Sequence, residues 1–327
     1  MKHVSILVPE YAVMSSLEDP RYLFQAVNQF LQNAGEEPLF DVHLVGLTKE
    51  VKLHEGTYTV HVNDLVEEVA STDLILLPAL IGNMPEVLAA NRDFVPWIVK
   101  QHQQGAEVAS LCAGAFFLAS TGLLNGKKCS THWVFANQFR EMFPEVELVD
   151  DKVITDENGI YSSGGANSLW NLLLYIIEKY TNREMAVLAA KYFAIEIDRN
   201  SQSPFIMFQG QSEHDDENIR AIQLFIERNY QQKLTVDDLC DRFAIARRSL
   251  ERRFKKATHN TTVEYIQRVK IEAAKKDLEK TTKSVNEVMF DVGYADTKAF
   301  RNVFKKITGL TPVEYRNKFN KEAAVWV

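Results

Sequence analysis

The sequence predicts an α/β domain, in which a parallel sheet is sandwiched by helices, followed by an all-α domain. Three observations support this fold class. Short β-branched runs alternate with amphipathic stretches up to about residue 193, strand signals end near residue 218, and the two parts carry opposite net charge. The chain has 327 residues, of which 46% are hydrophobic and 25% charged. That composition is typical of globular domains, and the length suggests about two of them.

The elements of the first domain follow in chain order. The expected strands are His3–Pro9, Phe40–Gly46, Asp73–Leu80, Glu107–Cys112, Val146–Val149 and Gly159–Ser162. The expected helices are Tyr22–Gln32, Asp93–Gln104, Gly114–Ser120, Asn167–Tyr180 and Arg183–Phe193. Near-continuous apolar strands separated by helices are typical of a parallel sheet that is covered on both faces.

A break in the periodicity separates the two domains. The segment Ser201–Asn218 contains SQSP and the acidic run EHDDEN, and no regular hydrophobic pattern crosses it. We therefore expect a first domain over residues 1–200, a linker over 201–217 and a second domain over 218–320.

The charge distribution also separates them. Residues 1–210 carry 14 basic and 26 acidic side chains, whereas residues 211–327 carry 23 basic and 18 acidic ones, within a total net charge of -7. A basic segment attached to an acidic body predicts that the second domain meets a polyanion. A solvated charged surface is the alternative that charge alone leaves open.

An internal repeat with a spacing of 50 residues defines the second domain. Ser249–Tyr265 (SLERRFKKATHNTTVEY) aligns with Ala299–Tyr315 (AFRNVFKKITGLTPVEY), with identical residues at 8 of 17 positions. A repeat of this kind indicates one supersecondary unit used twice.

A short capped helix precedes each copy. Thr235 stands three residues before Asp238, and Ser284 stands three residues before Glu287, which is the spacing of a capping box. The turns that follow are Ala244–Ala246 and Gly293–Asp296. Helix, tight turn and helix is the arrangement that places a second helix in the major groove of DNA.

Helical spacing separates a buried face from a polar face in each repeated helix. The expected polar faces carry Arg248, Glu251, Arg252 and Lys255 in the first unit, and Lys298, Arg301, Asn302 and Lys305 in the second. Arginine can bond guanine with both arms of its fork, and asparagine can do the same with adenine. Lysines near a helix end more often contact phosphate. Two equivalent basic faces favour DNA recognition over simple solvation.

The second domain, from about Asn218 to Phe319, resembles the DNA-binding domain of the AraC/XylS transcription regulators. The resemblance rests on RRSLERRF, on TVEYIQRVKIEAAKKDLEKT and on VNEVMFDVGYADTKAFRNVFKKITGLTPVEYR. It implies two helix-turn-helix units held apart by a long helix. By position, Arg248, Glu251 and Arg252 would face bases in the first unit, and Thr297, Lys298, Arg301 and Asn302 in the second. Ala246 departs from the pattern, because the family usually has a helix-capping serine there.

The first domain, up to about Phe193, resembles the DJ-1/PfpI branch of the class I glutamine-amidotransferase-like proteins. The resembling segments are LCAGAFFLASTGLLNGK, STHW, YSSGGANSLWNLLLYIIEKY and DRNSQSPF. The resemblance implies a flavodoxin-like sheet. Cys112 follows an apolar strand and precedes Gly114 and a helix, as in a strand-turn-helix elbow, and a helix N-terminus there is expected to lower the thiol pKa.

The residues around Cys112 argue against catalysis. A histidine directly follows the elbow cysteine in the peptidase-like relatives, whereas this chain has Ala113. The acidic position of DJ-1-like relatives aligns with Ser15, although Glu10 lies in the same loop. No catalytic residue is therefore predicted. A ligand pocket, an inert structural elbow, a thiol sensor and a cysteine hydrolase with a nucleic-acid-tethering tail stay open as interpretations. The pocket residues expected are Glu10, Ser15, Cys112, Ala113, His132 and Gly165.

These features predict a transcription regulator with an effector-binding first domain. The expected partners are double-stranded DNA, a small amino-acid-like or amine-like effector and a second copy of the chain, with RNA polymerase as a further candidate. No cofactor is expected, because phosphate-loop and dinucleotide fingerprints are missing, and no metal, because His43, His54, His61 and His102 lack the spacing of a metal site. Without a signal-peptide or membrane-span pattern, we expect a cytoplasmic protein.

Overall fold

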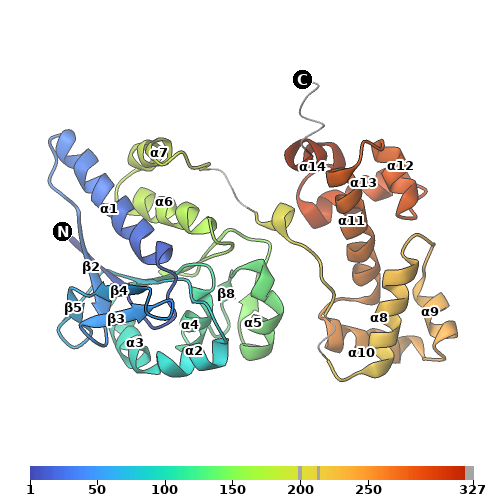
Figure 1. The fold of residues 1–327 in the computed structure, drawn as a ribbon, viewed down its shortest axis with the longest axis horizontal. Helices are drawn as coiled ribbons and strands as arrows, with labels where there is room; N and C mark the ends of the chain where they lie inside the picture. Colours follow the sequence, from blue (N-terminus) through green and yellow to red (C-terminus); the bar gives the residue numbers. More distant parts are fainter. Residues whose placement is uncertain (198–200, 212–213, 321–327) are drawn as a thin grey trace. The chain divides into compact units, whose positions relative to one another are not determined.

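The computed structural model describes residues 1–197, 201–211 and 214–320, and it divides into two compact units, Met1–Gln202 and Ser203–Val327. The first unit is the predicted α/β domain and the second is helical (Figure 1). Of the predicted linker 201–217, residues 212 and 213 lie outside the described residues. Among the described residues, no helix combines the length and apolar content that crossing a membrane requires.

A seven-stranded sheet forms the centre of the first unit. Its order is β10-β11-β7-β6-β1-β2-β5. The strands are β1 (Lys2–Leu7), β2 (Phe40–Gly46), β5 (Asp64–Leu65), β6 (Leu74–Leu77), β7 (Glu107–Ser110), β10 (Ile154–Asp156) and β11 (Ile160–Ser163). All neighbours pair in parallel except β10, which runs antiparallel to β11. The prediction of a parallel, doubly covered sheet is confirmed.

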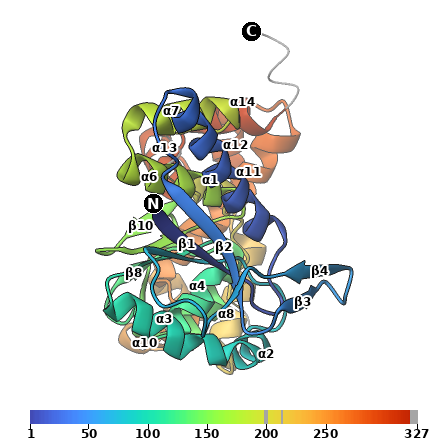
Figure 2. The same cartoon turned by 90° about the vertical axis from the view of Figure 1, so that its left-hand side faces the viewer.

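Helices cover both faces of this sheet (Figure 2). One core joins the sheet to α1 (Ser15–Asn33), α6 (Ser168–Tyr180) and α7 (Arg183–Tyr192), and the other joins it to α2 (Met84–Ala90), α3 (Val95–Gln103) and α4 (Gly114–Ser120). Strand β6 supplies both cores, because Leu74 and Leu76 face one side while Ile75 and Leu77 face the other. Alternation on an apolar strand explains why no polar residue interrupts it.

Several small elements of the first unit lie outside the predicted set. They are β5, β10, α2, the hairpin of β3 (Glu50–Leu53) and β4 (Tyr58–His61), the strand β8 (Lys128–Cys129), the 3-10 turn η2 (Trp133–Phe135) and α5 (Ala136–Met142). Strand β8 pairs with β9 (Glu147–Leu148), which lies within the predicted strand Val146–Val149, and the 3-10 turn η1 (Arg92–Phe94) overlaps the start of a predicted helix. The predicted helix Asp93–Gln104 is split, because it starts as η1 and continues as α3. The predicted strand Asp73–Leu80 ends at Leu77, because the chain leaves the sheet at Pro78.

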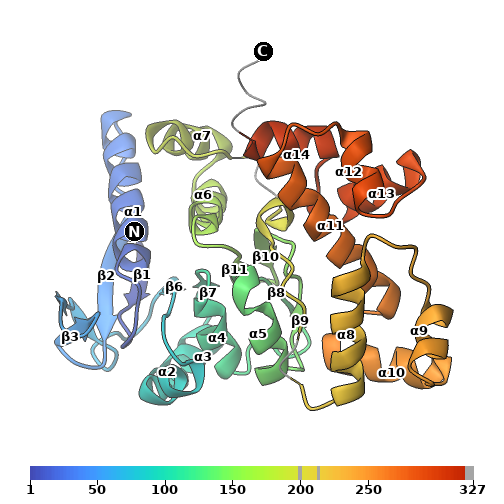
Figure 3. The same ribbon diagram turned by 45° about the vertical axis from the view of Figure 1, so that its right-hand side comes forward.

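The second unit consists of helices and one 3-10 turn, η3 (Ser203–Phe205). The helices are α8 (Glu217–Asn229), α9 (Val236–Arg242), α10 (Arg247–Thr258), α11 (Thr262–Lys280), α12 (Val285–Asp291), α13 (Thr297–Thr308) and α14 (Pro312–Phe319). Helix α11 runs from the group of α8 to α10 to the group of α12 to α14 (Figure 3). Each group has its own apolar core, around Phe254 and Phe304 respectively.

The repeat extends to individual hydrogen bonds. Thr258 donates to the Phe254 carbonyl and Thr308 to the Phe304 carbonyl, both at 2.8 Å. Capping boxes begin α9, α11, α12 and α14, including the two predicted at Thr235 and Ser284. The same sequence pattern therefore builds the same helix-turn-helix unit twice.

Candidate functional site

The polar faces of α10 and α13 form the candidate nucleic-acid interface. All eight residues predicted from helical spacing are exposed: Arg248, Glu251, Arg252, Lys255, Lys298, Arg301, Asn302 and Lys305. Thr297, the first residue of α13, is half-buried. On the opposite side of each helix, Phe254 and Phe304 are fully buried. The buried stripe fixes the rotation of each helix, and the basic residues consequently point to solvent.

The two faces differ in how many of their charges are already paired. In α10, Glu251 accepts from Arg247 at 3.2 Å, and Arg247 also pairs with Asp237 at 2.9 Å. Among the described residues, Arg248, Arg252 and Arg301 form no ion pair. These guanidinium groups keep their donors for an outside acceptor such as a base edge or a phosphate.

The helix starts differ as the sequence predicted. Asp296 caps α13, because its carboxylate accepts from the Ala299 amide at 2.6 Å. Ala246 stands at the N-cap of α10 and provides no side-chain cap. The turns differ too, since Ala244 has φ +47° where Gly293 has φ +73°. The first recognition helix therefore begins with fewer local restraints than the second.

Lys270, on α11, connects the two helix-turn-helix units. It is 5% exposed, and its Nζ donates to the carbonyls of Tyr230 at 2.5 Å and Val292 at 2.8 Å. These two residues are the C-caps of α8 and α12, so the ammonium meets the negative ends of both helices. Burial lowers the pKa of Lys270 to about 8. The contact fixes the two units to one another through α11.

Cys112 lies at the predicted elbow between β7 and α4. Its φ is +53°, the left-handed region, and its amide donates to Ser163 Oγ at 3.2 Å. Gly114 begins α4, and a Cβ there would lie 2.4 Å from the Pro78 carbonyl oxygen. Close packing of the elbow against the end of β6 therefore requires glycine at this position.

The thiol itself differs from the prediction. The elbow was expected to lower its pKa, but Cys112 is only 6% exposed, and burial raises the pKa of the thiol to about 11 in spite of the Ala113 backbone hydrogen bond. That expectation is wrong because desolvation disfavours the thiolate more than the helix end favours it. Among the described residues, no hydrogen bond joins Cys112 to an imidazole or carboxylate. Neutral thiol is the dominant form at neutral pH.

The other predicted pocket residues are distributed around the elbow. Ala113 is buried directly after Cys112. His132 caps η2, where its Nδ1 accepts from the Val134 amide at 3.2 Å, and burial lowers its pKa. Glu10 and Ser15 are exposed, and the backbone of Glu10 is held by Asn91. Within the described part of the chain, no hydrogen bond or ion pair brings either side chain to Cys112.

The backbone amide of Gly165 is already hydrogen-bonded to a side chain that the sequence does not predict at this place. The Gly165 amide donates to Gln202 Oε1 at 3.0 Å. Gln202 Nε2 donates to the Thr131 carbonyl at 3.0 Å, and Thr131 Oγ1 donates to the Cys112 carbonyl at 3.1 Å. Gln202 is fully buried. A side chain far along the sequence thus fills the space under the Gly164–Gly165 turn, and only the folded structure reveals it.

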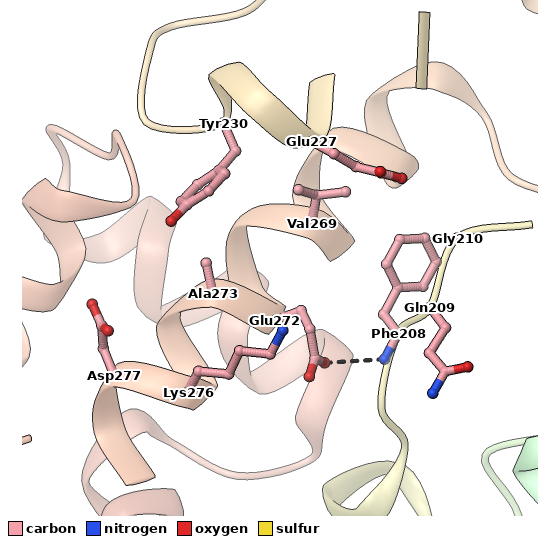
Figure 4. A pocket seen from close by; sticks show the side chains of 10 residues that line it. All are labelled: Phe208, Gln209, Gly210, Glu227, Tyr230, Val269, Glu272, Ala273, Lys276 and Asp277. Carbon is pink, nitrogen blue, oxygen red and sulfur yellow. Dashed lines mark hydrogen bonds between the residues drawn. The ribbon is translucent and has the colours of Figure 1, made fainter. Parts of the chain in front are cut away.

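A cavity of about 490 Å³ lies in the second unit between α8, α11 and the segment before α8 (Figure 4). Its lining residues are Phe208, Gln209, Gly210, Glu227, Tyr230, Val269, Glu272, Ala273, Lys276 and Asp277. Glu272 accepts from the Phe208 amide at 3.0 Å, drawn as the dashed line. Three carboxylates against one ammonium do not suit a phosphate, so this cavity is not part of the nucleic-acid interface.

Comparisons with known families divide the chain in the same way. The family model described as DJ-1/PfpI family matches residues 20–179, and a model described as helix-turn-helix domain matches residues 239–318. The first match contains the elbow at Cys112 and most of α1 and α6, and the second contains both recognition helices.

Curated relatives resemble both parts. HTH-type transcriptional regulator CdhR of Pseudomonas aeruginosa is 23% identical over 95% of this chain and 90% of its own length. HTH-type transcriptional regulator GbdR of the same species is 28% identical over 76% of this chain and 67% of its own length. A solved transcriptional regulator protein from Vibrio parahaemolyticus matches 58% of this chain and 98% of its own, with a TM-score of 0.52 and 23% identity, which supports the fold.

Proposed function

Since this chain is an HTH-type transcription regulator that joins a DJ-1/PfpI domain to an AraC-type helix-turn-helix domain, we propose how its two parts divide the work. The polar faces of α10 and α13 read the operator, and the region around Cys112 binds a small effector. The observation that carries the first assignment is the pair of equivalent helices whose exposed faces present arginines that form no ion pair with the described residues, namely Arg248 and Arg252 on α10 and Arg301 on α13.

Arg252 and Arg301 are the residues on which base recognition should depend most. Both are exposed in the middle of a recognition helix. A bidentate contact between arginine and guanine contributes about 1–3 kcal/mol, so each substitution by alanine should weaken operator binding roughly 5- to 150-fold. Non-specific binding should change much less.

The test is a binding titration of operator and random-sequence DNA at two salt concentrations. Fragments upstream of the protein's own gene serve to find the operator. Arg228→Ala is the matched control, because Arg228 is an exposed arginine on α8, outside both recognition helices. Equal loss of operator affinity in Arg228→Ala, Arg252→Ala and Arg301→Ala would contradict the assigned faces.

For the effector, we propose a site beside the elbow in which the Gly165 amide takes part. This amide is held by Gln202, so a ligand that offers a carboxylate or carbonyl oxygen competes with a side chain of the protein itself. Gln202 immediately precedes η3, which starts the second unit and whose Phe205 packs on Phe319 of α14 at 5.9 Å between ring centroids. Displacing Gln202 frees the chain segment that leads into the DNA-binding unit.

Gln202→Ala tests this coupling. If Gln202 acts as the displaced group, the variant should bind operator DNA without effector as wild-type protein does with effector. Gln209→Ala is the control, because Gln209 is an exposed glutamine in the same segment. The titration uses a pool of amino acids and amines. A wild-type response to the pool that Gln202→Ala retains unchanged would exclude the mechanism.

We further propose that the first unit is not catalytic. A buried neutral thiol with no imidazole or carboxylate partner in the described part of the chain lacks the base that cysteine catalysis requires. We also propose that the chain binds DNA as a dimer. We expect it to act in the cytoplasm, where RNA polymerase is a further candidate partner. Residues 201–217 are proposed as the linker between a first domain over residues 1–200 and a second domain over residues 218–320.

A further inference from the structure

Two histidines and a carboxylate meet on β1 and β2, near the residues at which these parallel strands begin. The elbow, by contrast, follows the end of β7. His3 lies on β1, and Asp41 and His43 lie on β2. The strands pair with His3 opposite Asp41, and His43 follows two residues later. Since cross-strand partners and residues two apart share one face of a sheet, the three side chains point to the same side. One nitrogen or oxygen from each lies within 4.8 Å of the others.

The hydrogen bonds of His3 leave one nitrogen with a free lone pair. Its Nδ1 lies 3.0 Å from Thr72 Oγ1. The Thr72 hydroxyl hydrogen is directed to backbone carbonyls, that of His3 at 3.0 Å and that of Leu74 at 3.2 Å. Thr72 Oγ1 also accepts from Ser5 Oγ at 3.0 Å, and its second lone pair suits the tautomer of His3 that has its hydrogen on Nδ1. The Nε2 atom then carries the lone pair that a metal ion needs.

His43 is oriented in a comparable way. Its Nδ1 bonds a carboxylate oxygen of Asp64, and its Nε2 lies 3.0 Å from Asp41 Oδ1. A carboxylate on the far nitrogen of a histidine is the outer partner commonly found behind metal-bound imidazoles, because it fixes the ring and strengthens the nitrogen as a ligand. Asp64 therefore supports His43, while Asp41 remains next to the coordinating nitrogen.

The surroundings favour a cation. The carboxylates of Asp41, Asp64 and Asp73 lie around the two rings, and the ammonium of Lys2 pairs with Asp73 at 2.8 Å. The ring centroids of His3 and His43 are 4.8 Å apart. The ligand side chains are partly exposed, so an ion can enter from solvent and keep a water ligand.

We propose that His3, Asp41 and His43 bind one divalent transition-metal ion of the zinc class. Two imidazoles and one carboxylate suit such ions better than Mg²⁺ or Ca²⁺, which prefer oxygen ligands. With metal–ligand distances of about 2.0–2.2 Å, tetrahedral ligand atoms lie about 3.4 Å apart, so the side chains close in by small rotations. The ion replaces any hydrogen on His43 Nε2, which passes to solvent, and water completes the coordination.

The experiment uses the full chain purified without a polyhistidine tag. Co²⁺ is titrated while the visible absorption is recorded, and Zn²⁺ is then titrated against a chromophoric chelator. We expect one equivalent of Co²⁺ with the intense absorption of a four-coordinate site, its displacement by Zn²⁺, and at least a tenfold weaker affinity in His3→Gln and in His43→Gln. His54→Gln and His61→Gln are matched controls, because both residues are exposed histidines of the same unit.

Asp41→Asn protects the test from a folding defect. Asp41 is about half exposed, and asparagine keeps the shape of the side chain while it removes the negative charge, so the fold should persist, which circular dichroism checks. It should also bind Zn²⁺ more weakly. Absence of one-equivalent binding by the wild-type chain overturns the proposal. So does retention of full affinity in His3→Gln and His43→Gln, which would place the ion elsewhere.

Discussion

The turns of the two helix-turn-helix units differ in backbone strain. Ala244 and Gly293 occupy matching turns, and both have positive φ, +47° and +73°. A residue with a Cβ loses about 1–2 kcal/mol in the left-handed region, whereas glycine does not. The first turn is therefore strained and the second is not. Exchanging the residue type at each position should change the stability of the two units in opposite directions.

The magnitudes follow from the surroundings. Ala244 is exposed, so Ala244→Gly loses little packing; relief of strain, less about 0.4–1 kcal/mol of extra unfolded-chain entropy, leaves a stabilisation of about 0.5–1 kcal/mol. A Cβ on Gly293 would lie 2.3 Å from the Gln231 carbonyl oxygen and 2.7 Å from Lys270 Nζ. Strain plus forced displacement of backbone should make Gly293→Ala about 2–4 kcal/mol less stable.

Hydrogen exchange resolved by peptide measures each unit separately in the full chain. Ala244→Gly should slow exchange in α9 and α10 by roughly two- to fivefold, and Gly293→Ala should accelerate exchange in α12 and α13 by roughly 30-fold or more, since about 1.4 kcal/mol corresponds to a factor of ten. Ala257→Gly, in the last turn of α10, is the control and should accelerate exchange. If Ala244→Gly accelerated exchange in α9 and α10 as well, strain at this turn would not be the explanation.

Two further outcomes follow from the site geometry. With a pKa of about 11, Cys112 is roughly one part in a thousand thiolate at pH 8, so its alkylation by iodoacetamide, followed by peptide mass mapping, should be very slow and rise about tenfold per pH unit up to pH 11; rapid labelling at pH 7 would contradict a buried neutral thiol. Ala246→Ser should supply the missing cap of α10 and slow its hydrogen exchange, with a stabilisation of about 0.5–2 kcal/mol, while Ala257→Ser should not.

Local sequence patterns were sufficient wherever an element is regular and its neighbours follow in the chain. Strand β2 and helix α4 begin and end as predicted, because apolar runs and adjacent turns determine both. The two recognition helices could be oriented from spacing alone, since the repeat presents the same buried stripe twice. Helix α1 begins seven residues earlier than predicted, at Ser15, because it continues through Pro20, a residue that ordinarily marks a helix boundary.

Features that depend on contacts between distant segments could not be predicted from the sequence. Gln202 reaches Gly165 only after the chain returns to the sheet, and nothing in the spacing of DRNSQSPF predicts a buried carboxamide. His3 and His43 are 40 positions apart, and only the parallel register of β1 and β2 brings them together. The pKa of Cys112 also depends on distant segments, because the burial that raises it comes from residues of several strands and helices packed around the thiol.

The elbow shows how a backbone geometry can outlast the chemistry associated with it. Positive φ at Cys112 and the tight contact of Gly114 with Pro78 are enforced by the packing of α4 against β6 and β7, whatever the elbow side chain does. A reactive thiol would additionally need solvent access and a proton acceptor, and burial opposes both. The strained turn is therefore explained by the fold, and it gives no evidence for catalysis. Under the proposed mechanism, the elbow supplies a rigid frame beside Gly165, where an effector that displaces Gln202 would change the hydrogen bonds of the segment that precedes the second unit.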